Sequence, residues 1–514
     1  MTPAGTNLLL AHADATPAPS DVVTKSLRFN GGDSPVLTRT PSSSGSQTTF
    51  TISLWVKRSD LNSTGYETIW ASEASGYNYT LLTYYTDGLR FQSHGLGATP
   101  TLQSNAVFRD VSAWYHIVLS VDTTQATDTN RVKIYVNGSA ITFSSATYPT
   151  LNYDLQVNTS SYTNMIGLSY GTGQYFDGYL ADVHFIDGQA LTPTSFAEED
   201  ATTGQWKPKA FSGTYGTNGF HLDFEEDSAT GGSNAGIGKD VSGNGNYLNT
   251  SNLSTWDVVL DNPSPNSNYC TLNALDIGGG TLSEGNLAFV AGGAHRAVKA
   301  TQAFPPSSKR YFEVVLSNSF SNPPAIGIMS DTAKVSDQIN AIQSRFVRGN
   351  GYTYNNGSEI ASGYASWASG DIIGLQIDTT ANTLKFRING GSWTTAFSDL
   401  SGYAWLPCLK SYDGAHKLIA NFGQDPTFAG NKSGGATSEF FYTPPTDFLA
   451  LSTAGMTATI AKPSEHFNTL TYASSGAKTG VGFQPDLVWV KARGNTYDHE
   501  LTDSVRGVTK ALSS

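Results

Sequence analysis

Short runs of alternating apolar and polar residues, each closed by turn residues, recur along most of this chain and constrain its fold more than any other feature. Apolar and polar residues alternate within runs 50–56 and 114–121, and run 132–136 leads directly into Asn137-Gly138. Side chains of a β-strand point alternately to its two faces, and Asn-Gly favours a tight hairpin turn. The pattern predicts an all-β chain of antiparallel strands.

Length and composition narrow the classes further. A chain of 514 residues is expected to hold roughly three domains. Charged residues make up only 14% of it, whereas Gly (52), Tyr (25) and Phe (25) are abundant, which argues against a helical bundle. The net charge of −12 without a Lys/Arg cluster excludes nucleic acid as a partner.

The termini and cysteines give little information on compartment. Cys270 and Cys408 are too few for a disulfide framework. The N-terminus has no positive region and only three consecutive apolar residues, at 8–10, so we expect neither a signal peptide nor membrane insertion, and synthesis in the cytoplasm.

Five motifs in order identify the first domain. They are Leu27-Arg-Phe-Asn30, Ile52-Ser-Leu-Trp-Val-Lys57, Trp114-Tyr-His-Ile-Val118, Val132-Lys-Ile-Tyr-Val-Asn-Gly138 and Phe176-Asp-Gly-Tyr-Leu-Ala-Asp-Val-His-Phe185. In this order they resemble concanavalin A-like LamG/pentraxin jelly-roll sandwiches. Alternation predicts a two-sheet core with Trp55, Trp114, Ile117 and Leu119 pointing inward, and with Lys57, His116 and Lys133 pointing to solvent.

A second ordered set begins after residue 268. Tyr311-Phe-Glu-Val-Val-Leu316, Gly370-Asp-Ile-Ile-Gly-Leu-Gln-Ile-Asp378, Leu384-Lys-Phe-Arg-Ile-Asn-Gly390 and Ile419-Ala-Asn-Phe-Gly-Gln424 resemble the SPRY domain, also a β-sandwich. Gly482-Phe-Gln-Pro-Asp-Leu-Val-Trp-Val-Lys491 and its neighbours resemble a β module that follows LamG and SPRY units in phage virion and tail-fibre proteins. The predicted organisation is a docking arm (1–25), a LamG/concanavalin A-like sandwich (26–200), a Gly/Asn-rich connector (201–268), a SPRY-like sandwich (269–435) and a C-terminal β module (436–514), for which truncation is an open alternative.

Catalytic motifs are weak. The Glu-x-Asp-x-x-Glu string of laminarinase-type hydrolases is absent from the sequence, and the acidic groups 198–200 and 225–227 are consecutive, as in solvated turns. Gly167-Leu-Ser-Tyr-Gly171 matches the Gly-x-Ser-x-Gly sequence of a nucleophile elbow. That motif needs a helix after the serine, and no helix pattern follows here. The nine histidines are scattered without zinc spacing. We therefore predict no enzyme and no cofactor, with a glycan depolymerase as a minor alternative.

Calcium binding is kept as an alternative, because LamG and pentraxin relatives often hold Ca²⁺ at the rim of the sandwich through loop carboxylates. The acidic residues considered for it are Asp87, Asp122, Asp128, Asp177 and Asp182, and a structural role is favoured for the last two.

Two aromatic clusters are candidate carbohydrate sites, because aromatic faces stack on sugar C–H groups. The first contains Tyr66, Trp70, Tyr77 and Tyr79, with Tyr84 and Tyr85 nearby; the second contains Tyr352, Tyr354 and Trp367, with Tyr364. The alternative is that about half of these rings fill the cores.

The module order implies a structural virion protein of a tailed phage, most simply a tail fibre that adheres to host-surface glycan or protein. Its arm would dock on other virion proteins, and self-association as a homotrimer would multiply weak sites. The alternative within structural proteins is a capsid-surface fibre or decoration protein that contacts mainly other virion subunits.

Overall fold

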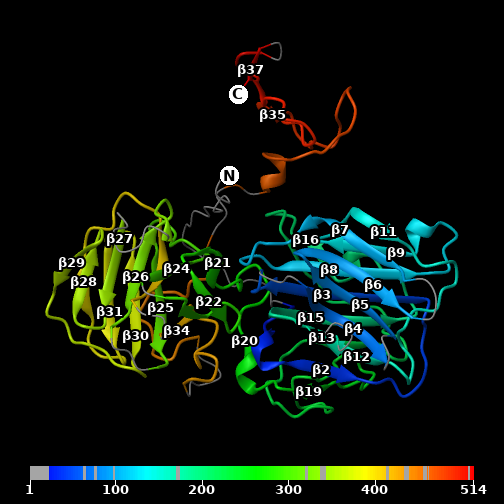
Figure 1. The fold of residues 1–514 in the computed structure, drawn as a ribbon, viewed down its shortest axis with the longest axis horizontal. Helices are drawn as coiled ribbons and strands as arrows, with labels where there is room; N and C mark the ends of the chain where they lie inside the picture. Colours follow the sequence, from blue (N-terminus) through cyan, green and yellow to red (C-terminus); the bar gives the residue numbers. More distant parts are fainter. Residues whose placement is uncertain are drawn as a thin grey trace. The chain divides into compact units, whose positions relative to one another are not determined.

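The computed structural model describes residues 22–61, 65–74, 78–95, 99–169, 174–293, 295–318, 322–335, 343–412, 416–432, 439–454, 456, 460, 462–507 and 510–513. The chain divides into two compact units, one made of 1–198 and 207–457 and the other of 199–206 and 458–514. The first unit holds two β-sandwiches, coloured blue to green and green to orange along the chain in Figure 1. The prediction of an all-β, tandem-sandwich fold is confirmed.

The first sandwich packs two antiparallel sheets, each eight-stranded within the described residues. One sheet runs in the order β10 (Ser139–Ala140), β9 (Val132–Val136), β8 (Tyr115–Asp122), β3 (Thr49–Arg58), β15 (Gly178–Asp187), β1 (Ser26–Phe29), β20 (Val258–Val259), with β18 (Phe220–Leu222) also on β15. The other runs β11 (Phe143–Thr147), β7 (Thr101–Val107), β6 (Gly88–His94), β5 (Asn78–Tyr85), β4 (Tyr66–Ala74), β12 (Thr163–Ile166), β2 (Val36–Arg39), β19 (Asn249–Ser251).

The segment 201–268, predicted as a connector, contributes strands and core residues to the first sandwich. Its strands β18, β19 and β20 pair with β15, β2 and β1 of the first sandwich. Its side chains Phe220, Leu222, Phe224, Ile237 and Leu248 lie in that sandwich's core. The segment therefore completes the first sandwich, although its Gly- and Asn-rich composition hides the few apolar residues that do so.

Both faces of the β3–β8–β15 sheet are covered, and this corrects part of the predicted core. Ile117 and Leu119 are in the core as predicted. Trp55 lies on the opposite face, stacked on His116 at 4.8 Å between ring centroids. Trp114 lies on that face too and donates from Nε1 to Asp261 Oδ1 at 3.0 Å.

Lys57 and His116 were expected in solvent, and that prediction is wrong, since both are fully buried, whereas Lys133 is partly exposed. The predicted faces were therefore wrong for Trp55 and Trp114, and alternation does not reveal that further chain covers the second face. Part of that cover is the ring cluster of Phe196, Phe211 and Tyr215, packed on Val118 and Ile186.

The second sandwich packs two sheets that are seven-stranded over the described residues. One runs β21 (Leu272–Ile277), β24 (Arg296–Ala300), β33 (Trp405–Ser411), β26 (Ala325–Ser330), β27 (Ser344–Arg348), β28 (Tyr352–Asn355), β29 (Ser358–Ala361). The other runs β22 (Gly280–Ser283), β23 (Ala288–Ala291), β34 (Lys417–Asn421), β25 (Lys309–Leu316), β30 (Ile372–Asp378), β31 (Thr383–Ile388), β32 (Thr394–Phe397).

The remaining elements are short. They are the strands β13 (Leu168–Ser169), β14 (Gln174–Tyr175), β16 (Ala197–Glu199) and β17 (Trp206–Pro208) and the 3-10 turns η1 (Gly31–Asp33), η2 (Asp128–Asn130), η3 (Pro193–Ser195), η4 (Thr255–Asp257) and η6 (Pro463–Glu465). Over the described ranges, the structure contains no helix with the length and hydropathy needed to span a bilayer.

The second unit contains a three-stranded sheet of β35 (Leu487–Val490), β36 (Glu500–Asp503) and β37 (Ala511–Ser513). All four residues of β35 are exposed, and Trp489 donates from its indole nitrogen to His499 Nδ1 at 2.8 Å. This unit thus leaves an apolar strand uncovered by the residues that the structure describes.

Buried charges join the two sandwiches of the first unit. Lys57 donates to Asp261 Oδ2 at 2.7 Å, to Asn268 Oδ1 at 2.9 Å and to the Tyr269 carbonyl at 2.7 Å. Arg28 on β1 pairs with Asp425 of the second sandwich at 2.6 Å. Tyr179 Oη donates to the Gly285 carbonyl at 2.7 Å. In each case a buried polar group of the first sandwich finds at least one partner at or beyond residue 269, in the second sandwich.

We expect Lys57→Met to lower the free energy of unfolding by about 3 to 5 kcal/mol, because it leaves the Asp261 carboxylate buried without its cation. Lys239→Met, which breaks a solvent-facing pair with Glu226, is the matched control and should leave the denaturation midpoint unchanged. Guanidinium titration measures both. Equal midpoints for the two variants would contradict a joining role for Lys57.

A partly buried carboxyl, that of Asp177, gives the fold a pH dependence. Burial raises the pKa of Asp177 to about 6, against hydrogen bonds from Ser59 Oγ and the Gly31 amide that favour the charged form. The unfolded pKa is about 3.9, so the folded state retains the proton longer. The contribution of Asp177 to the free energy of unfolding is complete below about pH 4 and falls by about 3 kcal/mol as the pH rises through 6.

The Asp177→Asn side chain mimics the protonated carboxyl. The free energy of unfolding of this variant minus that of the unsubstituted chain should therefore be larger at pH 7.5 than at pH 4.5. Urea unfolding of the two proteins at both values measures this difference. A difference that does not change with pH would show that Asp177 titrates normally.

Candidate functional site

The outer face of the β4–β5–β6–β7 sheet gathers aromatic and polar side chains in neighbouring register positions. Tyr66 pairs with Tyr85, and Tyr79 pairs with His94. On β5 the residues Leu82 and Tyr84 point into the core, so Tyr79 and Tyr85 point the other way. We call the set Tyr66, Tyr79, Tyr85, Arg90, Gln92, His94 and Gln103 the tyrosine face.

A β-bulge in β4 places one aromatic residue of the first predicted cluster in the core and another at the surface. The β4–β5 register shifts between Thr68 and Trp70. The extra residue turns Trp70 inward, where it is 1% exposed, while Tyr66 stays on the outer face. Without the bulge, residues 66 and 70 would share one face. Alternation alone therefore cannot separate them.

Arg90 is the centre of the tyrosine face. Its guanidinium lies over the Tyr85 ring at 3.8 Å from the centroid and over the Tyr66 ring at 5.7 Å. Arg90 Nη1 donates to Tyr66 Oη at 3.1 Å, and Nε donates to Gln103 Oε1 at 2.8 Å. These contacts hold two partly exposed rings in fixed orientations beside a cation.

Polar groups surround these rings. Tyr66 Oη donates to Gln92 Oε1 at 3.4 Å, and the Tyr79 and His94 rings stack at 5.6 Å between centroids. Burial raises the pKa of the Tyr79 phenol, so it stays a neutral donor. Rings flanked by amide and guanidinium groups match the chemistry of sugar recognition, in which C–H faces stack and hydroxyls form hydrogen bonds.

The predicted first cluster divides as follows. Tyr66 and Tyr79 lie on the tyrosine face, with Tyr79 mostly buried at 8% exposure. Trp70 and Tyr84 fill the core, so their selection as ligand platforms is corrected. Tyr77 lies outside the described residues. Sequence reasoning missed Arg90, Gln92, His94 and Gln103, which alternate along β6 and β7 and were recognisable only once β5 was placed beside them.

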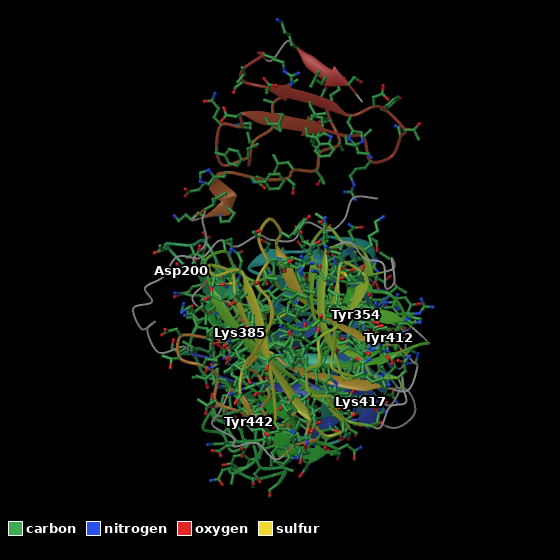
Figure 2. The ribbon with its side chains drawn as sticks, turned by 90° about the vertical axis from the view of Figure 1, so that its left-hand side faces the viewer. Asp200, Tyr354, Lys385, Tyr412, Lys417 and Tyr442 are labelled. Carbon is green, nitrogen blue, oxygen red and sulfur yellow. The ribbon has the colours of Figure 1, made fainter. Side chains whose placement is uncertain are left out.

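The second cluster is packed more tightly. Figure 2 labels Tyr354 and Tyr412, whose rings lie 5.9 Å apart between centroids. Arg348 lies 4.1 Å above the Tyr412 ring and binds Glu359 at 2.9 Å. Tyr354 is 6% exposed and Trp367, in the core, is 4% exposed, so neither ring offers a free face, whereas Tyr352 is partly exposed.

The acidic residues considered for calcium each have separate partners. Asp87 binds Arg58 and Arg109, Asp122 accepts from Thr124 and Gln125, and Asp128 accepts from the Thr129 amide. Calcium binding stays a prediction. Among the described residues, ligand atoms of Asp182, His184 and His221 lie within 4.8 Å of one another and form the group with metal-binding proximity.

The groups weighed for hydrolysis sit in ordinary structural roles. Ser169 is buried on β13 and donates to Glu73 Oε2 at 2.9 Å, with a strand turn rather than a helix around it. Asp200 caps a turn by accepting from the Thr202 and Thr203 amides. Glu226 pairs with Lys239.

Comparisons with known families agree with this architecture. Residues 30–196 match the Concanavalin A-like lectin/glucanases superfamily, residues 309–425 match the SPRY domain, and residues 462–514 match a Domain of unknown function (DUF7483). The chain thus contains a LamG/concanavalin A-like domain and a SPRY domain, β-sandwich modules of kinds that bind carbohydrate or protein and are typically non-enzymatic. No curated protein matches the chain in sequence.

Solved structures with similar parts include the SPRY domain of human HERC1, at 18% identity and a TM-score of 0.27, covering 29% of this chain and 96% of that one. The TRIM65 PSpry domain is similar at 15% identity and a TM-score of 0.24, with 30% and 91% covered. The native heptameric SAP-like pentraxin from Limulus polyphemus is similar at 18% identity and a TM-score of 0.26, with 34% and 80% covered.

We expect Trp70→Ala to cost about 3 to 5 kcal/mol of unfolding free energy, because it empties a core position. Tyr66→Ala on the same strand should cost less than about 1 kcal/mol, since its ring lies at the surface. Thermal melting of both variants measures the contrast. Similar losses for both would mean that the bulge does not separate surface from core.

Proposed function

We propose that the chain is a non-enzymatic adhesion protein that binds glycan through the tyrosine face and acts as a tail fibre or similar appendage on the virion of a tailed phage. The observation that carries the binding role is the fixed pair of partly exposed rings, Tyr66 and Tyr85, around Arg90. Rigid strands hold these groups, so binding loses little side-chain entropy.

Arg90 indicates the class of glycan. Its guanidinium is the cation among the side chains that define the tyrosine face, and it is partly exposed. A guanidinium forms paired hydrogen bonds with carboxylates, which neutral sugars lack. We therefore propose an acidic surface polysaccharide, bearing uronic or related acids, as the ligand.

The placement on a phage virion is supported by the order of LamG-like, SPRY-like and terminal modules, which resembles that of virion and tail-fibre proteins. In this proposal residues 1–25 dock on other virion proteins. A homotrimer would present three tyrosine faces, and linked weak sites gain avidity from effective concentration.

Two alternatives remain distinguishable. A capsid-surface fibre or decoration protein would contact mainly virion subunits and would show no saturable binding to host cells. A glycan depolymerase needs two carboxyl groups about 5 to 9.5 Å apart beside the bound sugar. Glu73 lies beside Tyr79 on this face and is already bonded to Ser169, which favours binding over hydrolysis.

We expect the double variant Tyr66→Ala/Tyr85→Ala to bind susceptible bacterial cells, and their extracted acidic polysaccharide, at least about tenfold more weakly, because two stacking surfaces are lost. Arg90→Gln should weaken binding to the acidic polysaccharide and reduce its salt dependence. Biolayer interferometry and cell pull-down measure these changes with the full chain.

Tyr403→Ala is the matched control, because Tyr403 is 46% exposed in the second sandwich and lies away from the tyrosine face in sequence and domain. It should bind like the unsubstituted chain. Unchanged binding by the folded double variant, or equal loss in the control, would overturn the assignment of this face.

A further inference from the structure

Two histidines and an aspartate converge on the outer side of β15. His184 on β15 pairs in register with His221 on β18, and their rings stack at 4.0 Å between centroids. Asp182 Oδ1 lies 2.8 Å from His221 Nε2 and 3.0 Å from His184 Nε2. Both imidazole nitrogens thus face one carboxylate oxygen.

A second bulge places the aspartate. The β15–β3 register shifts between Ala181 and His184, and Asp182 has a φ of 51°, in the left-handed region. Aspartate adopts this conformation more readily than most residues other than glycine, and here it accompanies the bulge. It turns the Asp182 carboxylate to the same side as both imidazoles.

One nitrogen of this cluster makes only a poorly aligned contact with the carboxylate. His184 Nε2 is buried, and although Asp182 Oδ1 is 3.0 Å away, the pair lacks hydrogen-bond geometry. An unsatisfied buried nitrogen normally costs free energy, so it requires an explanation. Coordination of a metal ion by the Nε2 lone pair would supply the missing interaction.

The surroundings support such a role. His184 Nδ1 lies 3.1 Å from Tyr215 Oη, and the rings of Phe196 and Phe211 pack against His184. Metal-ligating histidines almost always have their second nitrogen bound by an outer partner, which fixes the ring orientation. His221 is partly exposed, at 21% for its side chain, and provides access from solvent.

We propose that Asp182, His184 and His221 form a binding site for a first-row divalent metal ion, with Zn²⁺ as the preferred ion. The donor set of two imidazole nitrogens and one carboxylate oxygen suits Zn²⁺ rather than Ca²⁺. At Zn–ligand distances near 2.0 Å, tetrahedral ligands lie about 3.3 Å apart, so each Nε2 must move a few tenths of an ångström away from Asp182 Oδ1. The stacked imidazole rings, inclined by 17° to each other, must also rotate so that both Nε2 lone pairs point to the same ion. The fourth position is left to water.

The test uses the full chain, stripped with EDTA and dialysed, and titrated with ZnCl₂ by calorimetry and with CoCl₂ by visible absorption. We expect one equivalent of Zn²⁺, a cobalt spectrum of a tetrahedral site, and a melting temperature that rises with Zn²⁺. His221→Gln and Asp182→Asn should each weaken binding by more than about 100-fold. Tyr215→Phe should weaken it about tenfold with unchanged stoichiometry, as expected for an outer partner.

His94→Gln, on the tyrosine face, is the control and should keep the affinity of the unsubstituted chain. Failure of the unsubstituted chain to bind Zn²⁺ or Co²⁺, or full affinity in folded His221→Gln, overturns the proposal. If both ligand variants fail to fold, diethyl pyrocarbonate labelling of the unsubstituted chain decides instead. Protection of His221 by Zn²⁺, with His499 still labelled, supports the site, and equal labelling of both refutes it.

Discussion

Lys57 carries its charge into a position without solvent exposure, and its three acceptors come from 261–269, where the first sandwich passes into the second. A buried ammonium is tolerated only when every donor is satisfied. The chain must therefore bring Asp261 and Tyr269 onto the outer face of β3. These contacts and the Arg28–Asp425 ion pair cover the outer face of the sheet that contains β3 and β1. The tyrosine face therefore lies on the other sheet of the first sandwich.

Strand periodicity was enough to predict an all-β fold, because alternation and Asn-Gly turns are local properties, whereas the two sandwiches were predicted from the resemblance of the ordered motifs to LamG and SPRY domains. It failed where a strand departs from strict alternation or gains a second cover. The bulge at 68–70 separates Tyr66 from Trp70, and the cover over β3 buries Lys57 and His116. His184 and His221 are 37 positions apart in sequence, and only the β15–β18 register brings them together.

The two proposed sites share a physical design. Both place side chains on paired strands rather than on loops. In both, a bulge sets the direction of nearby side chains, at 68–70 for the tyrosine face and at 181–184 for the Asp182 cluster. Strand-mounted groups are held by backbone pairing, so their geometry exists before a ligand binds. The tyrosine face is broad and partly exposed, which suits a polymer, whereas the Asp182 cluster is narrow and mostly buried, which suits a single ion.

The central claim is that the tyrosine face is the surface that holds glycan. Hydrogen–deuterium exchange of the full chain with and without purified host-surface polysaccharide tests it most directly, because it locates binding without substitution. We predict slower exchange in the edges and turns of β4, β5 and β6 around Tyr66, Tyr85 and Arg90. Slower exchange confined to the second sandwich, with β4–β6 unchanged under saturating polysaccharide, would contradict the claim.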